Sequence, residues 1–457
     1  MAERRPEPVV RRWPGWPDLP AIQAAAPRQF PFLLDSSGGP AALARYSLLL
    51  FCPTAEPDLK ETAGEPFLAA LDRAFADAGG VPPGTASGAS PLPFGGGWFV
   101  YLGYELAASI EPGLALPAAA GAAGRLPVAA AWRCPAALVL DHRRRQAMLV
   151  AEHPDALEQA AAGLAAAEIT SPPLAELPPF ALVMDPPERF LAGVGRIHDY
   201  LAAGDVFQVN LSRRWHLNGG SPVDPHAVYR RLRLCNPAPF AGCCRIGASW
   251  LLSSSPERLL KAGGGEVVTR PIAGTYARTP HSADDQARSA ALRRHPKERA
   301  EHIMLIDLER NDLGRVCVPG SVRVAELLAV ESYAHVHHLV SAVRGRLPPA
   351  ATPGRIIGAV FPGGTITGCP KVRCMEIIAE LEGDGRGYYT GAMGYLGRDG
   401  NMELNILIRS MLVTGHGIEW RTGAGIVADS HPASELAETQ AKARGLLAAL
   451  GLAGDRG

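Results

Sequence analysis

Two groups of acidic residues have the spacing of a helix face and are candidates for metal binding. Each follows a proline, and the groups are Pro296, Glu298 and Glu301, and then Pro432, Glu435, Glu438 and Lys442. Because proline is favoured in the first turn of a helix and residues three or four apart share a face, each group should project to one side. The spacing alone is typical of solvated acids near helix N-termini. The alternative is an oxygen-rich Mg²⁺ site assembled between two helices.

Single polar or charged residues inside apolar segments are further candidates. Residues 206–213 alternate in the manner of a strand, which places Gln208 on a polar face, although a half-buried strand at a sheet edge gives the same pattern. Glu257 follows a proline at the end of a predicted strand, where a glutamate is usually solvated. Arg409 lies on the predicted strand 405–411 between apolar neighbours, so it should be partly buried. A buried arginine needs a carboxylate, from the protein or from a ligand.

Three histidines, His335, His337 and His338, lie close together in the chain and invite a zinc interpretation. On a strand, however, residues 337 and 338 face opposite sides. No cysteine ligand pattern accompanies them. The pattern therefore disfavours zinc.

Glycine-rich segments indicate places where the backbone approaches a ligand. Residues 269–275 (TRPIAGT) follow a predicted hairpin whose turn is 263–265, and Gly274 is free to adopt a positive φ. Residues 423–425 (GAG) offer backbone N–H groups to an anion. Residues 363–371 (GGTITGCPK) lack the adjacent Gly-Lys-Ser/Thr of a nucleotide loop. This last segment is instead expected to cover a substrate and to lead into a helix.

The composition favours a globular enzyme of the cytoplasm. The 457 residues carry 45 basic and 45 acidic side chains, so no long-range field favours nucleic acid or a membrane surface. No apolar run approaches the ~20 residues of a membrane helix, and the proline-rich N-terminus has no signal-peptide core. Eight cysteines without a C-x-x-C pair are typical of reduced thiols.

The order of predicted elements favours an α+β fold. Residues 1–167 contain strand-like runs separated by Pro- and Gly-rich spacers, and residues 168–187 are rich in proline and are expected to form a linker. Residues 188–450 alternate long helices with antiparallel strand pairs, which is not the pattern of a doubly wound sheet. The helix that begins near residue 188 should end at Gly204.

The motifs together resemble the chorismate-utilising enzymes, which include anthranilate synthase component I, aminodeoxychorismate synthase component I, and the isochorismate and salicylate synthases. The matching segments are 207–212 (FQVNLS), 255–258 (SPER), 269–275, 310–316 (RNDLGRV), 337–341 (HHLVS), 361–373 (FPGGTITGCPKVR), 400–409 (GNMELNILIR) and 423–430 (GAGIVADS). The resemblance implies an anthranilate synthase component I-like fold, with antiparallel sheets packed into a sandwich-like core and flanked by helices. Residues 188–450 would form its chorismate-binding catalytic region.

The resemblance also implies roles for individual residues. Mg²⁺ would be bound directly by Glu301 and Glu438, with Glu298 and Glu435 acting through water. Glu257 would be the general acid or base at the ring hydroxyl, and His338 would pack against the ring. The substrate carboxylates would be bound by Arg409, Tyr389, Thr275, Gly274, Gly423, Gly425 and Lys442.

The position of Gln208 separates members of the family by their nucleophile. Isochorismate and salicylate synthases carry a lysine there, which activates water. The neutral amide of Gln208 cannot act as that base, so ammonia is the expected nucleophile. The chain has no G-x-C-x-G segment, which implies that a separate glutamine amidotransferase subunit supplies the ammonia.

Two products remain open. Residues 33–36 (LLDS) and 336–341 (VHHLVS) resemble aminodeoxychorismate synthase component I, which implies 4-amino-4-deoxychorismate and a role in 4-aminobenzoate and folate biosynthesis. Ala273 stands where that enzyme usually has a nucleophilic lysine. Alanine is the anthranilate synthase pattern, which implies anthranilate and pyruvate for tryptophan biosynthesis. A catalytically silent chorismate-binding subunit is a third hypothesis, disfavoured by the intact Glu257, acidic pairs and Arg409.

Overall fold

The structure is a computed structural model. It describes residues 7–54, 56–62, 64–85, 92–169, 177–218, 222–279, 282–332, 336–415 and 417–452. For Thr275, Ala277, Ser282, Ala283 and Lys297 the description is confined to the backbone.

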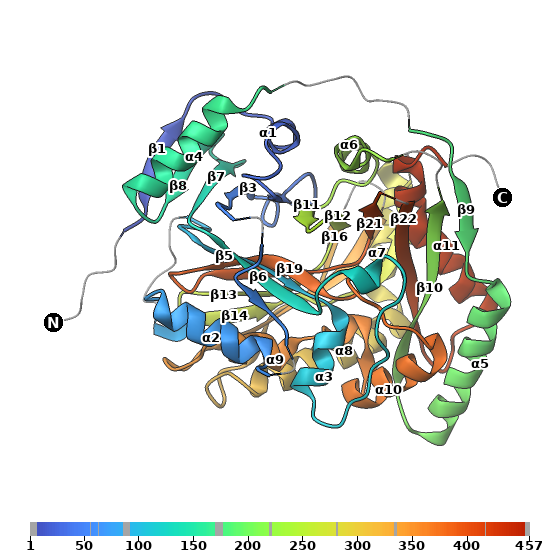
Figure 1. Cartoon of the computed structure of the whole chain (residues 1–457). Coiled ribbons are helices and arrows are strands. Elements are labelled where there is room, and N and C mark those ends of the chain that lie inside the picture. The colour runs from blue at the N-terminus through green and yellow to red at the C-terminus, as the bar shows by residue number, and fades with distance from the viewer. Residues whose placement is uncertain are drawn as a thin grey trace.

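Two antiparallel sheets form the body of the molecule (Figure 1). The first has the order β1 (Val9–Trp13), β8 (Gln146–Ala151), β7 (Ala136–Asp141), β3 (Tyr46–Phe51), β2 (Phe32–Asp35), β11 (Phe240–Ile246), β12 (Ser249–Ser255), β21 (Ser410–Thr414), β22 (Gly417–Ile426), β10 (Gln208–Asn218) and β18 (Gly368–Cys369), with β9 (Ala181–Met184) beside β10. The second has the order β15 (Ile272–Ala277), β17 (Val336–Arg346), β14 (Glu266–Thr269), β13 (Arg258–Gly263), β20 (Met402–Ile406), β19 (Ala392–Gly397), β5 (Gly97–Leu102), β6 (Ala129–Cys134) and β4 (Leu59–Lys60), with β16 (Arg323–Ser332) beside β17.

The inner faces of the two sheets share one apolar core. Phe32 of β2 stacks on Phe99 of β5 with ring centroids 3.9 Å apart, and Trp132 of β6 packs against both rings. Neighbouring residues of a strand point to opposite faces. Leu33 accordingly leaves this inner core and packs on the outer face of the first sheet. The sheets therefore form a sandwich, as expected.

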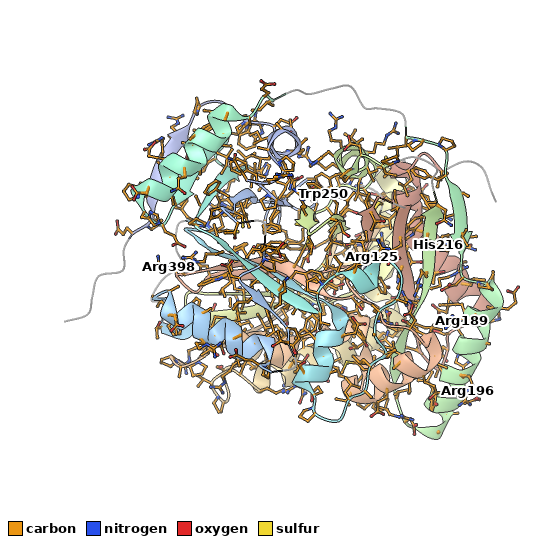
Figure 2. The ribbon with its side chains drawn as sticks, viewed as in Figure 1. Arg125, Arg189, Arg196, His216, Trp250 and Arg398 are labelled. Carbon is orange, nitrogen blue, oxygen red and sulfur yellow. The ribbon has the colours of Figure 1, made fainter. Side chains whose placement is uncertain are left out.

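Helices cover the outer faces (Figure 1). Their bounds are α1 (Leu19–Ala25), α2 (Phe67–Asp77), α3 (Ala107–Ile110), α4 (Pro154–Ala166), α5 (Pro187–Ala203), α6 (Pro225–Cys235), α7 (Ser282–Arg294), α8 (Pro296–Gly314), α9 (Pro353–Val360), α10 (Lys371–Glu382) and α11 (Pro432–Ala449). Helices α1, α4, α6 and α11 pack on the first sheet, α2, α8 and α9 on the second, and α5 and α10 on β10. In Figure 2 the side chains fill the interior, while Arg196 of α5 lies at the periphery and pairs with Asp199.

The α+β prediction is confirmed, and so are several local ones. Helices α8 and α11 begin at their prolines, and α5 ends at Gly204, whose φ is 79°. The turn 263–265 joins β13 to β14. Each of these signals is local, because proline and glycine act through their own φ angles.

The sheets draw strands from both predicted regions. The first sheet places β2, from residues 1–167, directly beside β11, from residues 188–450. The second does the same with β5 and β19. Within the predicted linker 168–187, residues Ala181–Met184 form β9 and pair with β10. Residues 188–450 are thus built into sheets that strands of residues 1–167 complete.

Two further observations concern the chain as a whole. Across the described ranges, none of the helices has the length and apolar character needed to cross a membrane. All eight cysteines are described, and all are free thiols.

Candidate active site

Glu257 lies where the chain passes from the first sheet to the second, between β12 and β13. Its N–H donates to Ser255 Oγ at 3.2 Å, and its C=O accepts the Ile406 N–H at 3.0 Å. The side chain is buried, with 5% of the residue exposed, and Oε1 accepts the Ile272 N–H at 3.4 Å. Both sheets therefore hold the carboxyl in place.

The surroundings of Glu257 favour its protonated form. Burial raises the pKa of Glu257 to about 8, and the carboxyl of Glu309 adds to the rise. The Thr365 hydroxyl and the charge of Lys442 act in the opposite direction on this pKa. At neutral pH the side chain keeps its proton, because the rise carries its pKa well above the usual carboxyl range. It is equipped to act as a general acid.

His337 and His338 face opposite sides of β17, as predicted. His337 Nε2 lies 3.0 Å from Asp285 Oδ1 of α7. His338 is 5% exposed, and burial lowers its pKa to about 3, with Arg409 and Lys442 lowering it further. Its ring is neutral at physiological pH and offers a flat surface rather than a charge. His335, the third histidine of the group, lies outside the described residues.

Gly274 lies at a bulge of β15 that only glycine fits. The pairing of β15 with β17 shifts register between Ala273 and Thr275, and Gly274 has a φ of 75°. A Cβ at Gly274 would lie 2.7 Å from Glu298 Oε2 of α8. The missing side chain thus lets Glu298 approach the strand opposite His338.

Arg409 was predicted to lie on a strand, and this was wrong. Strand β20 ends at Ile406 and β21 begins at Ser410, so Arg409 occupies the bend between them. Its φ of 51° is incompatible with a strand, and its C=O accepts the Ser254 N–H at 3.1 Å and the Ser254 hydroxyl at 3.0 Å. A residue forced into this conformation is a sign that the surroundings hold it in place.

Arg409 is partly buried beside the other candidates. Burial lowers its pKa, while Tyr389 and Glu438 act in the opposite direction. Among the described residues, no salt bridge or side-chain hydrogen bond occupies it. The internal salt bridge considered from sequence is therefore absent from this part of the chain, and the guanidinium is available to bind a carboxylate in two-point fashion.

Strands β10 and β22 form the next wall of the site. Gln208 is 9% exposed and Val209 fully buried, so both faces of the strand are covered, and the half-buried edge considered from sequence does not occur. Helices α5 and α10 cover one face of β10. The Gln208 Oε1 and Asn210 Oδ1 atoms are buried without a hydrogen-bond partner in the described structure. Buried acceptors normally have partners, so these two atoms favour a polar ligand or water here.

The glycines of β22 make room for these amides. A Cβ at Gly425 would lie 2.3 Å from Gln208 Nε2. A Cβ at Gly423 would lie 2.9 Å from both Asn210 Oδ1 and the Tyr389 hydroxyl. Glycine is required at both positions because any side chain would displace a polar group from the site.

Lys442 connects the C-terminal helix to this wall. Its Nζ donates to the Gly423 C=O at 2.8 Å and pairs with Glu438 at 2.7 Å. Lys442 also influences the pKa values of Glu257 and His338. Helix α11 thus lies against the same site as α8.

The four predicted metal ligands fit Mg²⁺ by their chemistry. Glu298 and Glu301 lie on α8, and Glu435 and Glu438 on α11, so the donor set consists of carboxylate oxygens. Over the described part of the chain, no three His, Cys, Asp or Glu side chains gather closely enough to hold one ion. An ion held here would need oxygens from substrate or water, which suits Mg²⁺ because it keeps part of its water shell.

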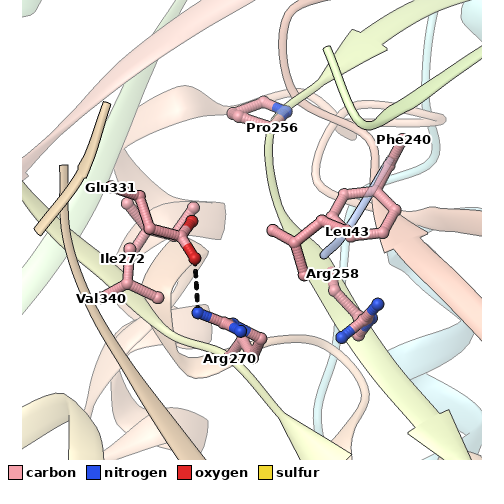
Figure 3. Close-up of a pocket in the computed structure, with 8 residues that line it drawn as sticks. All are labelled: Leu43, Phe240, Pro256, Arg258, Arg270, Ile272, Glu331 and Val340. Carbon is pink, nitrogen blue, oxygen red and sulfur yellow. Dashed lines mark hydrogen bonds and ion pairs between the residues drawn. The ribbon is translucent and has the colours of Figure 1, made fainter. Parts of the chain in front are cut away.

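A small cavity near these segments is not the site itself (Figure 3). Pro256 and Ile272 line it, together with Arg270, whose guanidinium faces Glu331 at 2.6 Å. Its arginine is already paired, and no predicted site residue lines it.

Comparison with known proteins identifies the family. Residues 58–448 match the sequence profile of a family described as chorismate binding enzyme. The chain belongs to this family. Anthranilate synthase component 1 of Streptomyces coelicolor is 40% identical over 454 residues, covering 94% of this chain and 85% of that protein. Aminodeoxychorismate synthase component 1 of Bacillus subtilis is 42% identical over 326 residues, or 69% of each chain.

A solved structure confirms the expected fold of this chorismate-binding enzyme. Anthranilate synthase component I from Streptococcus pneumoniae is similar with a TM-score of 0.75 and 30% identity. The similarity covers 88% of this chain and 92% of that one. The anthranilate synthase component I-like architecture is therefore shown, while the relatives divide between two reactions.

The chorismate-binding enzyme also contains a buried charge network that sequence reasoning missed. Arg386 is 2% exposed, donates to Glu382 at 2.7 Å and to the Asn210 C=O at 2.8 Å, and lies over the Tyr389 ring. Arg421 donates to the same Glu382 carboxylate at 2.7 Å. The network holds β10 and Tyr389 in position. Its one sequence signal is the i, i+4 spacing of Glu382 and Arg386, which surface pairs share.

Proposed function

We propose that this chain is the chorismate-aminating component I of an aminodeoxychorismate synthase. The observation that carries the aminating chemistry is the pair of Glu257 and Gln208. A buried carboxyl that keeps its proton at neutral pH is suited to protonate a departing ring hydroxyl. The amide of Gln208 contributes no base to activate water. Ammonia is therefore the nucleophile that best matches these side chains.

In the proposed reaction, Glu257 transfers its proton to the hydroxyl on ring carbon 4, which departs as water. Ammonia forms the new bond to that carbon, and the resulting ammonium returns a proton to the Glu257 carboxylate. His338 supports the ring as a neutral surface. Arg409 binds the enolpyruvyl carboxylate in two-point fashion, with Tyr389 beside it.

Glu301 and Glu438 would hold Mg²⁺ directly, supported by Glu298 and Glu435. When bound, the ion would neutralise the negative charge of the ring carboxylate. Both Glu438 and Lys442 belong to α11, and their ion pair keeps Lys442 directed to the Gly423 C=O. One helix face would thus carry both a carboxylate to hold the Mg²⁺ and the ammonium of Lys442.

The choice of product rests on the resemblance of 33–36 and 336–341. In the structure, Asp35 of the first segment is 4% exposed. It accepts hydrogen bonds from Tyr229 at 3.0 Å and Ser47 at 2.9 Å, and pairs with Arg233 at 2.5 Å. The longer glutamate of anthranilate synthases would not fit this closed arrangement without moving its partners. This supports aminodeoxychorismate synthase.

Ala273 is the observation that favours the second candidate, anthranilate synthase component I. Its methyl group cannot attack ring carbon 2, so ammonia would have to reach carbon 4 directly, and amination should be slow. Both relatives described above bear component 1 in their names. We therefore propose a glutamine amidotransferase as the second subunit, supplying ammonia in a heterodimer.

Identification of the product tests the proposal. With chorismate, Mg²⁺ and ammonium ions, the chain should form an aminated chorismate that an added aminodeoxychorismate lyase converts to 4-aminobenzoate. Anthranilate and pyruvate formed without the lyase would establish the second candidate instead. Isochorismate formed at a comparable rate in ammonia-free buffer would contradict the role of Gln208. If no turnover occurred under any of these conditions, the chain would be a catalytically silent chorismate-binding subunit.

The variant Ala273→Lys sharpens this test. It should keep the product of the aminodeoxychorismate reaction and, with ammonia withheld, trap a covalent adduct at carbon 2 that mass spectrometry detects. Ala273→Met, which is similar in length without an amine, is the matched control. An adduct in both variants would show that another residue is the nucleophile.

A further inference from the structure

We propose that Glu309 is a positioning residue that shares a proton with Glu257 and so keeps Glu257 ready to act as the acid. The inference rests on the proposed amination of chorismate. Glu309 belongs to α8, two turns beyond Glu301, and was not among the residues singled out by sequence. Its side chain faces inward, with 6% of the residue exposed.

The two carboxyls border the same short turn. Glu309 Oε1 lies 3.4 Å from the place that a Cβ of Gly364 would take, in the 3₁₀ turn Gly364–Ile366. Thr365, the next residue of this turn, lies beside Glu257. Its hydroxyl oxygen is buried without a hydrogen-bond partner among the described residues. The residue that borders Glu309, Gly364, and the residue that borders Glu257, Thr365, are therefore neighbours in the chain.

The segment between β14 and β15 links them a second time. The Thr269 hydroxyl lies beside Glu309 and, like that of Thr365, is buried and unpartnered in the described structure. Three residues later, the Ile272 N–H donates to Glu257 Oε1 at 3.4 Å. Two unpartnered hydroxyls next to two buried carboxyls are suited to relay a proton, because a hydroxyl both donates and accepts.

The charges around Glu309 do not cancel its own. Lys371 is the cation that faces it, but Lys371 Nζ pairs with Asp312 at 2.6 Å. Burial raises the pKa of Glu309 to about 7, and Asp312 adds to this rise. Lys442 is the cation that lowers the pKa of Glu257 among the described residues named beside it.

Two carboxyls enclosed together titrate as a pair. Both hold protons at low pH, and the first proton leaves near neutrality. The remaining proton is then held more tightly, since removing it would place two like charges in one dry region. Because the pKa of Glu257 is about 8 and that of Glu309 about 7, this second proton resides mainly on Glu257. The negative charge of Glu309 thereby extends to higher pH the range over which Glu257 can donate its proton.

The pH dependence of amination tests the coupling. Activity should fall as pH rises through the pKa of Glu257, and Glu309→Gln should move this alkaline limb of kcat to lower pH by roughly one unit, the scale of a single like charge at short range. KM for chorismate should change little. Glu309→Asp, which keeps the carboxyl, should return the alkaline limb of kcat most of the way to its wild-type pH. Asp72→Asn is the matched control, because Asp72 is a half-buried carboxyl whose pKa is also raised by burial, and it accepts hydrogen bonds from Thr352 and Gly354 rather than from a residue of the site.

A limb that stays in place in a folded Glu309→Gln protein would overturn the proposal. Should that variant fail to fold, the reciprocal measurement replaces it: carboxyl carbons labelled with ¹³C are titrated by NMR in the wild type and in Glu257→Gln. Because the two carboxyls share protons, the Glu309 signal of the wild type should show a second, smaller step at the pH where Glu257 loses its proton, and this step should be missing in Glu257→Gln. A wild-type Glu309 titration with a single step would also overturn the proposal. Neither substrate nor product enters this measurement, so its outcome is separate from the identity of the product.

Discussion

At the scale of single residues, the candidate site combines a protonated acid, a neutral ring and a cation, Arg409, that forms no ion pair with the described residues. Burial is the common cause, because it disfavours charge on Glu257 and on His338. Arg409 keeps its charge, since a guanidinium is effectively never deprotonated in proteins. The one group that remains charged is thus the one suited to bind a carboxylate substrate.

Arg409→Lys tests this assignment. Lysine keeps the charge and loses the planar fork, so KM for chorismate should rise about 10- to 100-fold, in line with the ~1.5–3 kcal/mol of a charged hydrogen bond. The effect on kcat should be smaller, and steady-state kinetics separate the two. Arg196→Lys, an exposed arginine on α5, is the control. Unchanged kinetics in Arg409→Lys would show that another residue binds the carboxylate.

At the scale of elements, two helices and four strands, two from each sheet, enclose the site. Helix α8 approaches β15 because Gly274 has no side chain, and α11 approaches β22 through the bond from Lys442 to the Gly423 C=O. Strands β10 and β22 lie in the first sheet, and β15 and β17 in the second. The proposed Mg²⁺ site would therefore join a helix of each sheet.

The role of α11 is tested by Glu438→Gln. The amide is a poor Mg²⁺ ligand, so Mg²⁺-dependent turnover should be abolished while the far-UV spectrum and melting temperature stay near those of the wild type. Glu435→Gln should reduce turnover less, by about 10- to 100-fold, as expected for a group acting through water. Calorimetric titration with Mg²⁺ reads binding without turnover. Glu158→Gln, an exposed acid of α4, is the control. If Glu438→Gln kept full activity and an unchanged Mg²⁺ requirement, α11 would not contribute a ligand to the metal site.

At the scale of the whole molecule, the site carries a cost in stability that depends on pH. Glu257 has a pKa of about 8 when folded and an ordinary value of 4.5, so its stabilising effect is lost as pH rises from 4.5 to 8. His338 has a pKa of about 3 against an ordinary 6.5, so its stabilising effect is lost as pH falls from 6.5 to 3. The contribution of these two groups to the free energy of unfolding should therefore be greatest where the two ranges overlap, between pH 4.5 and 6.5.

Glu257→Gln isolates the first of these effects. The amide has no proton to lose, so relative to the wild type the variant should gain roughly 1–3 kcal/mol in its free energy of unfolding on going from pH 5 to pH 8.5. Urea unfolding at the two pH values measures the difference. Glu158→Gln should show no such pH-dependent gain. An equal effect of Glu257→Gln at both pH values would mean that this carboxyl does not keep its proton in the folded protein.

The sequence by itself determined what depends on near neighbours. Pro296 and Pro432 start their helices, Gly204 ends another, and residues 263–265 turn a hairpin, because each acts through its own backbone angles. The alternation of strands and helices indicated the α+β class, and the family motifs indicated chorismate as the ligand to expect. The resemblance named the residues that the structure finds along β10, β15, β17, β22, α8 and α11.

Only the tertiary structure decided the properties that come from distant segments. The bend at Arg409 depends on Ser254, which is 155 residues away in the chain, and its φ contradicts the local strand pattern. In the sequence, Glu309 is one acid among several on a charged helix. Only the structure shows that the turn at Gly364 lies against its side chain. Burial and charge pairing are set by whatever the fold brings alongside a side chain, and a local pattern carries no record of those neighbours.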